Sequence, residues 1–233
     1  MAPTEIKVLS TTAMKTVFEA LAGDFERATG NRLNVTLGPS LRLEKQLGDG
    51  EAADMAIVSA SGARDLIAAG KMIAAGVAEI AKSSIGVAVA KGAPKPDIST
   101  VESFKRAMLA ANSIACSKPV GGGQSGVHLA KVFDELGITA QMQAKSKYGA
   151  AGLAGLVVLR GEADIGIQQM AELMAVDGID VVGPLPAAIQ MITPFVAGIP
   201  ANASYPDAGR ALIAFLATPE VKRVLKAKGL EPA

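Results

Sequence analysis

Short β-prone runs alternate with helical segments along the first third of the chain. Residues 6–10 form the first run, and the segment after it, residues 13–29, repeats an apolar residue every four positions, at Val17, Leu21 and Phe25. The same order then recurs, with predicted strands at 32–37 and 55–58 and predicted helices at 41–47 and 63–69. Strands that alternate with helices favour a mainly parallel sheet with helices on both faces, so we expect an α/β fold.

A second series of helices and strands begins after a break that contains prolines. Residues 84–90 form a buried-looking strand, and Pro94 and Pro96 separate this strand from the next helix. Beyond this break the sequence predicts helices at 101–111, 125–136, 150–160 and 170–175, and strands at 113–117 and 164–168. The restart indicates that the chain forms two α/β lobes.

An uncharged stretch lies between Asp180 and Asp207 and leads into the C-terminal helices, which are predicted at 207–217 and 220–228. Prolines at positions 184, 186, 194, 200 and 206 divide the stretch into pieces shorter than the roughly 20 apolar residues that a membrane span requires. We therefore expect no insertion into a membrane. Thr218 is the expected N-cap of the last helix.

Charge and aromatic content exclude several classes of partner. The chain has 23 Lys and Arg against 22 Asp and Glu, a formal net charge of +1, and aromatic residues make up 3%. This charge gives no field that would attract nucleic acid, and few aromatic rings are available to stack bases. With one cysteine, Cys116, and one histidine, His128, neither a disulfide nor the usual Cys/His zinc site can form within the chain. We expect no nucleic acid partner, no metal and no cofactor.

The N-terminal residues run directly into the first predicted strand. They show neither the basic start nor the apolar segment of a secretory signal. Two locations therefore stay open. The protein is periplasmic if a signal peptide was removed, and cytoplasmic if Met1 is the native start.

Three junctions between a predicted strand and the next helix could bind an anion, because helix N-termini offer free N–H groups and a favourable dipole. The first contains Thr11 and Thr12, and the second contains Ser40 followed by Arg42. The third is rich in glycine and contains Gly122, Gly123, Gln124 and Ser125. A single Ser or Thr usually caps its own helix, but hydroxyls at several junctions, divided between two lobes, favour an anion held between the lobes.

The glycine-rich segment and its surroundings hold three other candidates for chemistry. Residues 121–126 match the pattern G-x-G-x-x-G, but no acidic residue follows at the offset that a dinucleotide site needs, so we interpret the match as chance. His128 lies near the start of a predicted helix and could act as a catalytic base, although a lone helix histidine is more often packed or solvated. Cys116 lacks a paired base and is expected to be a small buried residue.

Short motifs follow one another in a recognisable order along nearly the whole chain, at residues 10–14, 25–30, 38–40, 43–47, 53–57, 161–166 and 215–220. This order resembles the periplasmic molybdate-binding protein family, a branch of the type II solute-binding proteins of ABC transporters. The resemblance implies two α/β lobes joined by two crossover segments. Lobe one would comprise 1–82 plus 195–233 and lobe two 83–194, with a ligand in the cleft.

The resemblance also implies which residues bind the ligand. In this family, hydroxyls and backbone N–H groups of the first two junctions hold an oxyanion, which corresponds here to Thr11, Thr12 and Ser40. The other lobe would contribute backbone of the glycine-rich loop and a tyrosine, in whose place this chain has Gln168.

Two departures from the family pattern favour a different ligand. Glutamine replaces the tyrosine at position 168, and Arg42 stands where the family usually has a small residue. A guanidinium pairs bidentately with a planar carboxylate, and Gln124, Ser125 and Gln168 can add hydrogen bonds. We therefore expect a small carboxylate in preference to molybdate, with an exposed ion pair of Arg42 with Glu44 or Glu19 as the alternative role of this arginine.

Two functions fit these residues. The first is a solute-binding protein for a small di- or tricarboxylate, which would hand its ligand to an ABC transporter permease if the chain is exported. The second is a cofactor-independent isomerase of a small unsaturated tricarboxylate, because proteins similar to this family include an aconitate isomerase. A 1,3-proton shift needs an anion clamp and one acid-base group, which Arg42 with His128, Lys118 or Lys15 could supply.

Overall fold

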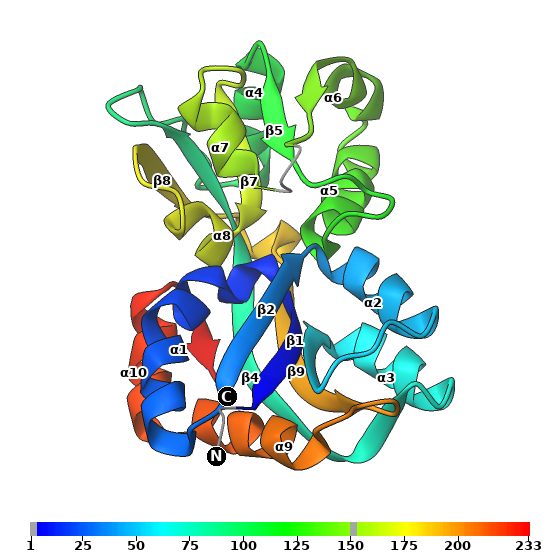
Figure 1. Cartoon of the computed structure of the whole chain (residues 1–233). Coiled ribbons are helices and arrows are strands. Elements are labelled where there is room, and N and C mark those ends of the chain that lie inside the picture. Colours follow the sequence, from blue (N-terminus) through cyan, green and yellow to red (C-terminus); the bar gives the residue numbers. More distant parts are fainter. Residues whose placement is uncertain (1–3, 150–152) are drawn as a thin grey trace. The chain divides into compact units, whose positions relative to one another are not determined.

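A computed structural model describes residues 4–149 and 153–233, which form two compact units (Figure 1). Unit 1 contains residues 1–82 and 193–233, and unit 2 contains residues 83–192. The chain passes from one unit to the other within β4 (Met72–Ala90) and near the start of β9 (Ile192–Pro200). Each unit is a sheet with helices on its faces, so the predicted α/β fold is confirmed.

The sheet of unit 1 has the strand order β2-β1-β3-β9-β4, with β10 beside β4. The strands not yet introduced are β1 (Glu5–Thr11), β2 (Arg32–Gly38), β3 (Met55–Ser59) and β10 (Glu231–Pro232). β1 is parallel to both β2 and β3, and Ser10 pairs with Leu37 on one side and with Ile57 on the other. The C-terminal ends of these three strands therefore lie at the same edge of the sheet.

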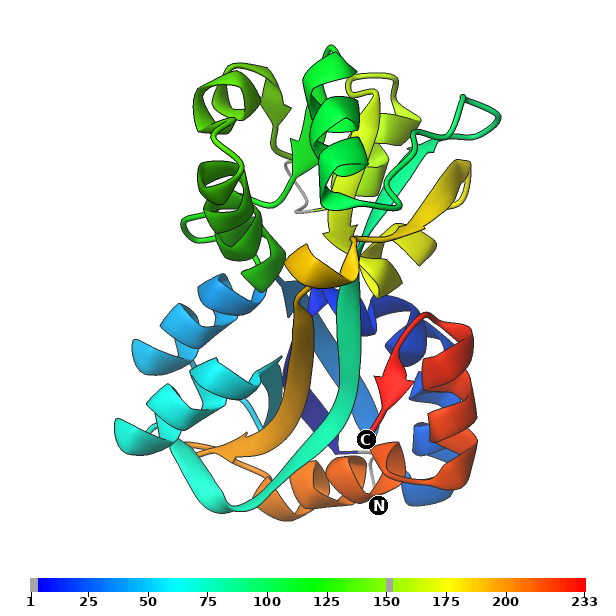
Figure 2. The same cartoon turned by 180° about the vertical axis from the view of Figure 1, so that it is seen from behind.

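Helices cover both faces of this sheet (Figures 1 and 2). They are α1 (Lys15–Thr29), α2 (Ser40–Gly48), α3 (Ala60–Ala68), α9 (Pro206–Leu216) and α10 (Pro219–Ala227). α2 and α3 share a buried cluster with Leu9 of β1 and Val58 of β3. Because side chains along a strand alternate between the two faces, Thr11 lies on the same face as Leu9, toward α2.

The opposite face of the unit 1 sheet packs against α1, α9 and α10 (Figure 2). Phe25 of α1 and Phe215 of α9 meet edge to face, with ring centroids 5.4 Å apart. The predicted cap of α10 is confirmed, because the Thr218 side chain accepts a hydrogen bond from the Val221 N–H. The ring contact holds α9 against α1.

The sheet of unit 2 has the order β4-β7-β5-β6, with β8 also paired to β4. Its further strands are β5 (Ile114–Cys116), β6 (Ser146–Lys147), β7 (Ile165–Gln169) and β8 (Ile179–Pro184). Its helices are α4 (Val101–Ala110), α5 (Gln124–Glu135), α6 (Thr139–Lys145), α7 (Ala154–Leu159) and α8 (Met170–Met174). β5 is parallel to β7, and Cys116 pairs with Ile167.

The two faces of the unit 2 sheet carry separate apolar clusters. Ile165 and Ile167 of β7 pack with α4, α5 and α6 on one face. Ala115 of β5 packs with α7 on the other. Side-chain alternation therefore places Ser117 and Gln168 on the α7 face, next to each other across β5 and β7.

The structure differs from the predicted elements in several places. β4 begins at Met72, twelve residues before the predicted strand start at 84, in an Ala-rich segment that alanine makes a weak strand former. α6, β6, β8, β9 and β10 were not predicted. The helix predicted at 150–160 is α7, which begins at Ala154, and residues 150–152 of that prediction lie outside the described residues. In these places strand pairing or helix packing sets the secondary structure, because the local sequence has no strong period.

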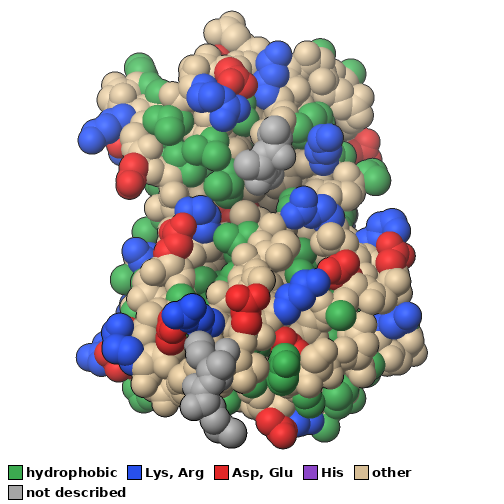
Figure 3. All heavy atoms as spheres, in the orientation of Figure 1, with side chains coloured by type: hydrophobic (Ala, Val, Ile, Leu, Met, Phe, Trp, Pro, Cys, Tyr) green, Lys and Arg blue, Asp and Glu red, His purple; other side chains and the backbone are tan. Residues whose placement is uncertain are grey.

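The surface matches the near-zero net charge. On the face of unit 1 seen in Figure 3, Lys and Arg side chains lie beside Asp and Glu side chains. Exposed ion pairs such as Lys15–Glu19 and Lys45–Asp49 contribute to this mixture. Within the residues that the structure describes, no helix is both long enough and apolar enough to cross a membrane.

Candidate functional site

Two hydroxyls predicted to bind a ligand meet at the C-terminal edge of the unit 1 sheet. Thr11 ends β1, and Ser40 is the first residue of α2. Both residues are buried, each with 3% of its surface exposed, and the Ser40 Oγ lies 3.4 Å from the Thr11 Oγ1, to which it donates. The parallel pairing of β1 with β2 explains this contact, because it sets Thr11 opposite Gly38 at the turn into α2.

Thr12 carries a hydroxyl without a partner. It follows Thr11 in the 3-10 turn at Thr12–Met14 and is 6% exposed. Its Oγ1 is buried and forms no hydrogen bond within the described part of the chain. A buried polar group left in this way costs about 1–3 kcal/mol, so we expect a water molecule, an ion or a ligand to pair with it. This atom is the clearest sign of a ligand site in unit 1.

α2 also begins without a side-chain cap. Its N-cap is Pro39, which has no polar side chain and forms no side-chain hydrogen bond to the helix. By contrast, Ser59 caps α3 by accepting from the Gly62 N–H at 3.1 Å. An uncapped helix start beside buried hydroxyls suits a negatively charged group, because the free N–H groups and the helix dipole both favour it.

Arg42 lies on the first turn of α2 and is exposed. Its Nη2 donates to the Leu37 carbonyl oxygen at 2.9 Å, which folds the guanidinium over Gly38. A Cβ at Gly38 would lie 2.4 Å from that nitrogen, so the absence of a side chain there makes room for the arginine. Only one of the five N–H groups of the guanidinium is used in this contact.

The acidic residues that could pair with Arg42 bind elsewhere. Glu19 pairs with Lys15 at 2.6 Å. The Glu44 Oε1 accepts from the Ser59 Oγ at 2.7 Å and from the Ser59 N–H at 3.3 Å. Within the described residues Arg42 therefore makes no ion pair, and its charge is available to a ligand.

Glu44 and Ser59 are polar residues of this edge that the sequence analysis missed. Both are at positions that could have drawn attention, since Ser59 follows a buried strand and Glu44 lies one helical turn after Ser40. Burial raises the pKa of the Glu44 carboxyl, and the nearby Asp65 carboxylate adds to this rise, while the hydrogen bonds from Ser59 oppose it. A partly buried carboxyl with a raised pKa beside a candidate anion site has the properties of a functional group.

Unit 2 brings together a second group of predicted residues. Ser125 on α5 donates through its Oγ to the Ser117 Oγ at 3.4 Å, and the Gln168 Nε2 donates to the same Ser117 oxygen at 3.3 Å. The Gln168 Oε1 accepts from the Ala154 N–H at 2.6 Å, at the start of α7. Ser117 was not predicted as a site residue, although it opens the glycine-rich junction. Its buried hydroxyl joins β5, β7 and α5.

The glycine-rich loop turns tightly against its own backbone. A Cβ at Gly122 would lie 2.2 Å from the Lys118 carbonyl oxygen, and one at Gly126 would lie 2.4 Å from the same atom. Gly123 is the N-cap of α5 and, having no side chain, leaves the helix start uncapped. Gln124 follows it and is half-buried. The loop thus presents backbone N–H groups at a second uncapped helix start, as the sequence predicts for an anion site.

His128 lies one turn into α5 and is half-buried. Its Nε2 lies 2.8 Å from the Ile189 carbonyl oxygen, within unit 2. Since a carbonyl oxygen only accepts, this nitrogen carries a proton, and the contact ties α5 to the 3-10 turn at Ala187–Ile189. The His128 ring therefore makes a structural contact, whether or not it also transfers a proton.

Cys116 is buried at the end of β5, as expected. Burial raises the pKa of its thiol to about 11. At pH 8 only about one thiol in a thousand would be ionised, so we expect the folded protein to react very slowly with iodoacetamide. Mass spectrometry of the alkylated protein measures this, with the urea-unfolded chain as the fast-reacting control. Rapid modification of the folded chain would contradict the buried, protonated thiol.

Comparison with known proteins identifies relatives over almost the full length. A family model described as bacterial extracellular solute-binding protein matches residues 6–231. An aconitate isomerase from a Pseudomonas species is 33% identical over 235 residues, which cover 98% of this chain and 88% of that protein.

Two solved structures with the same fold are of proteins named for an inorganic oxyanion that they bind. The periplasmic molybdate-binding protein of Azotobacter vinelandii has a TM-score of 0.81 and 20% sequence identity, with 98% of this chain and 99% of that chain covered. The sulfate-binding protein of Mycobacterium tuberculosis has a TM-score of 0.77 and 18% identity, with 99% and 87% covered. At these identities the likeness concerns the fold.

Proposed function

Because the chain belongs to the bacterial extracellular solute-binding protein family, as its resemblance to molybdate-binding proteins predicts, we propose that it binds a small di- or tricarboxylate. One observation carries this proposal. The buried Thr12 hydroxyl has no partner within the described residues, and Thr12 follows Thr11, whose hydroxyl meets that of Ser40 at the uncapped start of α2. A carboxylate oxygen supplies the acceptor that this hydroxyl and the helix N–H groups need.

Arg42 supports a carboxylate in preference to molybdate. Its guanidinium is planar, and the N–H groups that do not bind the Leu37 carbonyl can form a fork against a planar carboxylate. Because molybdate-binding members of the family usually have a small residue at this position, Arg42 favours a different ligand. The aconitate isomerase, named for a substrate with three carboxylates, is also more similar in sequence to this chain than the molybdate-binding and sulfate-binding proteins are.

The residues predicted in unit 2 have the features of an anion-binding group within that unit. Gly122, Gly123 and Gln124 would donate backbone N–H groups from the start of α5, and Ser125 would add a hydroxyl. Gln168 binds both Ser117 and the Ala154 N–H, so we assign it the role of holding the loop and α7 in place for the ligand.

We expect a small di- or tricarboxylate to raise the melting temperature more than molybdate does. A ligand that binds only the folded state stabilises it by mass action, by about 2.7 kcal/mol at a concentration one hundred times its Kd. Thermal shift with succinate, citrate, cis-aconitate, sulfate and molybdate, all at the same ionic strength, compares the two classes. A large shift with molybdate and none with any carboxylate would refute the proposed ligand class.

A cofactor-independent isomerase is the second candidate, supported by the 33% identity to an aconitate isomerase over 98% of this chain. Such a reaction moves a proton between two carbon atoms next to a carboxylate, and it needs an acid-base group beside the anion site. Of the groups considered from the sequence, Lys15 pairs with Glu19 and His128 binds the Ile189 carbonyl. Either contact would have to open, or share its proton, during catalysis.

Proton NMR of cis-aconitate in D2O distinguishes a binding protein from an enzyme. If the chain is an isomerase, we expect the trans isomer or deuterium exchange to appear with catalytic amounts of protein. Loss of this activity in His128→Ala, with carboxylate binding retained, would identify His128 as the base. If the protein binds the tricarboxylate but neither the isomer nor deuterium exchange appears, the isomerase is excluded and only the solute-binding function remains.

We propose a periplasmic location and delivery of the ligand to an ABC transporter permease. Both rest on the family, whose model describes extracellular solute-binding proteins and whose molybdate-binding relative is periplasmic. A cytoplasmic location is the alternative. Fractionation of cells that produce the protein from its full natural gene tests this, because recovery in the periplasmic fraction supports delivery and recovery in the cytoplasm argues against it.

A further inference from the structure

Glu44 places a carboxyl group at the N-terminus of α3, next to the proposed anion site. Its Oε1 accepts from the Ser59 Oγ and the Ser59 N–H, at 2.7 and 3.3 Å. The carboxyl lies over Gly62, where a Cβ would come within 2.0 Å of the Glu44 Cδ. The start of α3 is therefore filled by an acidic group of the chain itself, whereas the start of α2 has no side-chain cap.

The two helix starts are close neighbours. Ser40 and Glu44 are four residues apart on α2, so their Cβ atoms lie about 6 Å apart on the same side of the helix. Ser40 also contacts Thr11, and Thr12 supplies the unpartnered buried hydroxyl. An anion bound by these hydroxyls would lie within a short distance of the Glu44 carboxyl, in a partly buried place where solvent screens charge poorly.

The surroundings of Glu44 offer little positive charge to offset a second anion. Asp65 of α3 adds a like charge, and Ser59 at the end of β3 is neutral. On α2 itself, Lys45 pairs with Asp49, and the single charge of Arg42, which bonds the neutral Leu37 carbonyl, offsets only one charge of a di- or tricarboxylate. Burial and the Asp65 charge already raise the pKa of Glu44, and a bound anion would raise it further, since a nearby like charge favours the neutral form.

We propose that the anion site of unit 1 takes up one proton on Glu44 when it binds its ligand. The proposal rests on the proposed function, because it needs an anion beside Ser40, Thr11 and Thr12. The neutral carboxyl keeps an oxygen to accept from Ser59 and gains an O–H that can donate to the ligand. The proton comes from solvent and returns there when the ligand leaves.

The sign of the pH dependence follows from linkage. Below the pKa of Glu44 in the free protein, the group is neutral in both states and binding takes up no proton. Between that pKa and the higher pKa of the complex, each bound ligand takes up a proton, and affinity falls about tenfold for each unit of rising pH. Above the pKa of the complex, Glu44 is charged in both the free and the bound protein, and the affinity falls no further.

Titration calorimetry of wild type and Glu44→Gln tests the proposal. Citrate and sulfate serve as probes, from pH 5 to 8, each in two buffers that differ in ionisation enthalpy, so that the proton count per bound anion is measured. Glutamine keeps the size of the side chain and an oxygen for Ser59 but cannot titrate. The titration of citrate itself is common to both proteins and cancels in the difference between them.

We expect wild type to take up more protons than Glu44→Gln, by up to one per ligand, and to lose affinity more steeply as pH rises. At pH 8 the variant should bind tighter than wild type by about tenfold for each unit by which the ligand shifts the pKa of Glu44. Equal proton counts and equal pH slopes in the two proteins would overturn the proposal.

Asp65→Asn provides an independent variant, because it leaves Glu44 in place and removes the neighbouring charge that raises its pKa. The proton uptake should then move to lower pH, and this readout decides the question if Glu44→Gln does not fold. An unchanged pH window in Asp65→Asn would count against Glu44 as the titrating group. If wild type binds sulfate with proton uptake but binds no carboxylate, the proposed ligand class is refuted, and the proposed proton uptake by Glu44 is supported. Binding of neither probe by wild type would overturn both proposals.

Discussion

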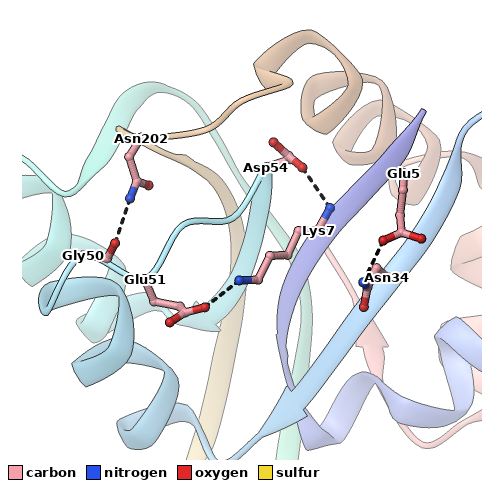
Figure 4. A network of polar contacts seen from close by, with 7 residues as sticks. All are labelled: Glu5, Lys7, Asn34, Gly50, Glu51, Asp54 and Asn202. Atoms are coloured by element: carbon pink, nitrogen blue, oxygen red, sulfur yellow. Dashed lines mark hydrogen bonds and ion pairs between the residues drawn. The ribbon is translucent and has the colours of Figure 1, made fainter.

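We expect Asp54→Ala to lower the free energy of unfolding by about 3–5 kcal/mol, a large part of the stability of a domain. Asp54 is 4% exposed, and its two carboxylate oxygens accept from the backbone N–H groups of Lys7 and Tyr205, each at 2.8 Å. The side chain therefore ties the start of β3 to β1, the contact drawn in Figure 4, and also to the start of α9, so it joins three segments that are far apart in the sequence. Alanine would leave both donors without their partner.

Urea unfolding followed by circular dichroism measures this effect, and Glu51→Ala is the matched control. Glu51 lies three residues before Asp54 and belongs to the same polar network, but it pairs with Lys7 at the surface, where about 43% of its side chain is exposed (Figure 4). An exposed pair of this kind contributes about 0–1 kcal/mol. Equal losses in the two variants would show that the buried hydrogen bonds of Asp54 do not hold these segments together.

The fold was predictable where the sequence carries a period. The four-residue repeat of Val17, Leu21 and Phe25 predicts α1, and these three side chains are buried in the structure. The first half of β4 has no such signal. It is a strand because β9 and β10 pair with it, and such long-range pairing leaves no mark in the local sequence.

The site was predictable where chemistry follows position in the fold. Hydroxyls at the ends of parallel strands meet at one sheet edge, so Thr11 and Ser40 could be paired from the order of elements alone. The contacts of Glu44 with Ser59, and of Gln168 with Ser117, join residues whose proximity depends on how α2 packs beside α3 and on the register of β5 with β7. Neither is visible in the sequence.

The partners of a side chain were harder to predict than its position in a helix or strand. Arg42 was expected at a helix start, where it lies, but the sequence left open a surface ion pair with Glu19 or Glu44. Both acids bind other groups, and the guanidinium instead lies over Gly38. Gly38, which precedes a proline, thus makes room for the guanidinium of Arg42. This contact depends on the turn between β2 and α2 and could not be predicted from the sequence.

We expect Arg42→Ala to weaken carboxylate binding by about 2–4 kcal/mol, or roughly 30- to 1000-fold in Kd, because it removes a charge-assisted pair that can be bidentate. The melting temperature without ligand should barely change. Arg42 is exposed, makes no ion pair within the described residues, and forms one hydrogen bond, to the Leu37 carbonyl. Titration calorimetry with citrate gives the change in Kd, and a thermal melt without ligand gives the change in stability.

Two further variants separate the fork geometry of Arg42 from its charge. Arg42→Lys keeps the charge but loses the planar fork, so we expect a Kd between those of wild type and Arg42→Ala. Arg27→Ala removes the same charge from the exposed end of α1, where the arginine pairs with Asp24, and it should leave Kd unchanged. If Arg27→Ala weakens binding as much as Arg42→Ala does, the effect comes from net charge alone. If Arg42→Ala binds citrate as tightly as wild type, Arg42 is not the carboxylate clamp, and the hydroxyls of Thr11, Thr12 and Ser40 must hold the anion without it.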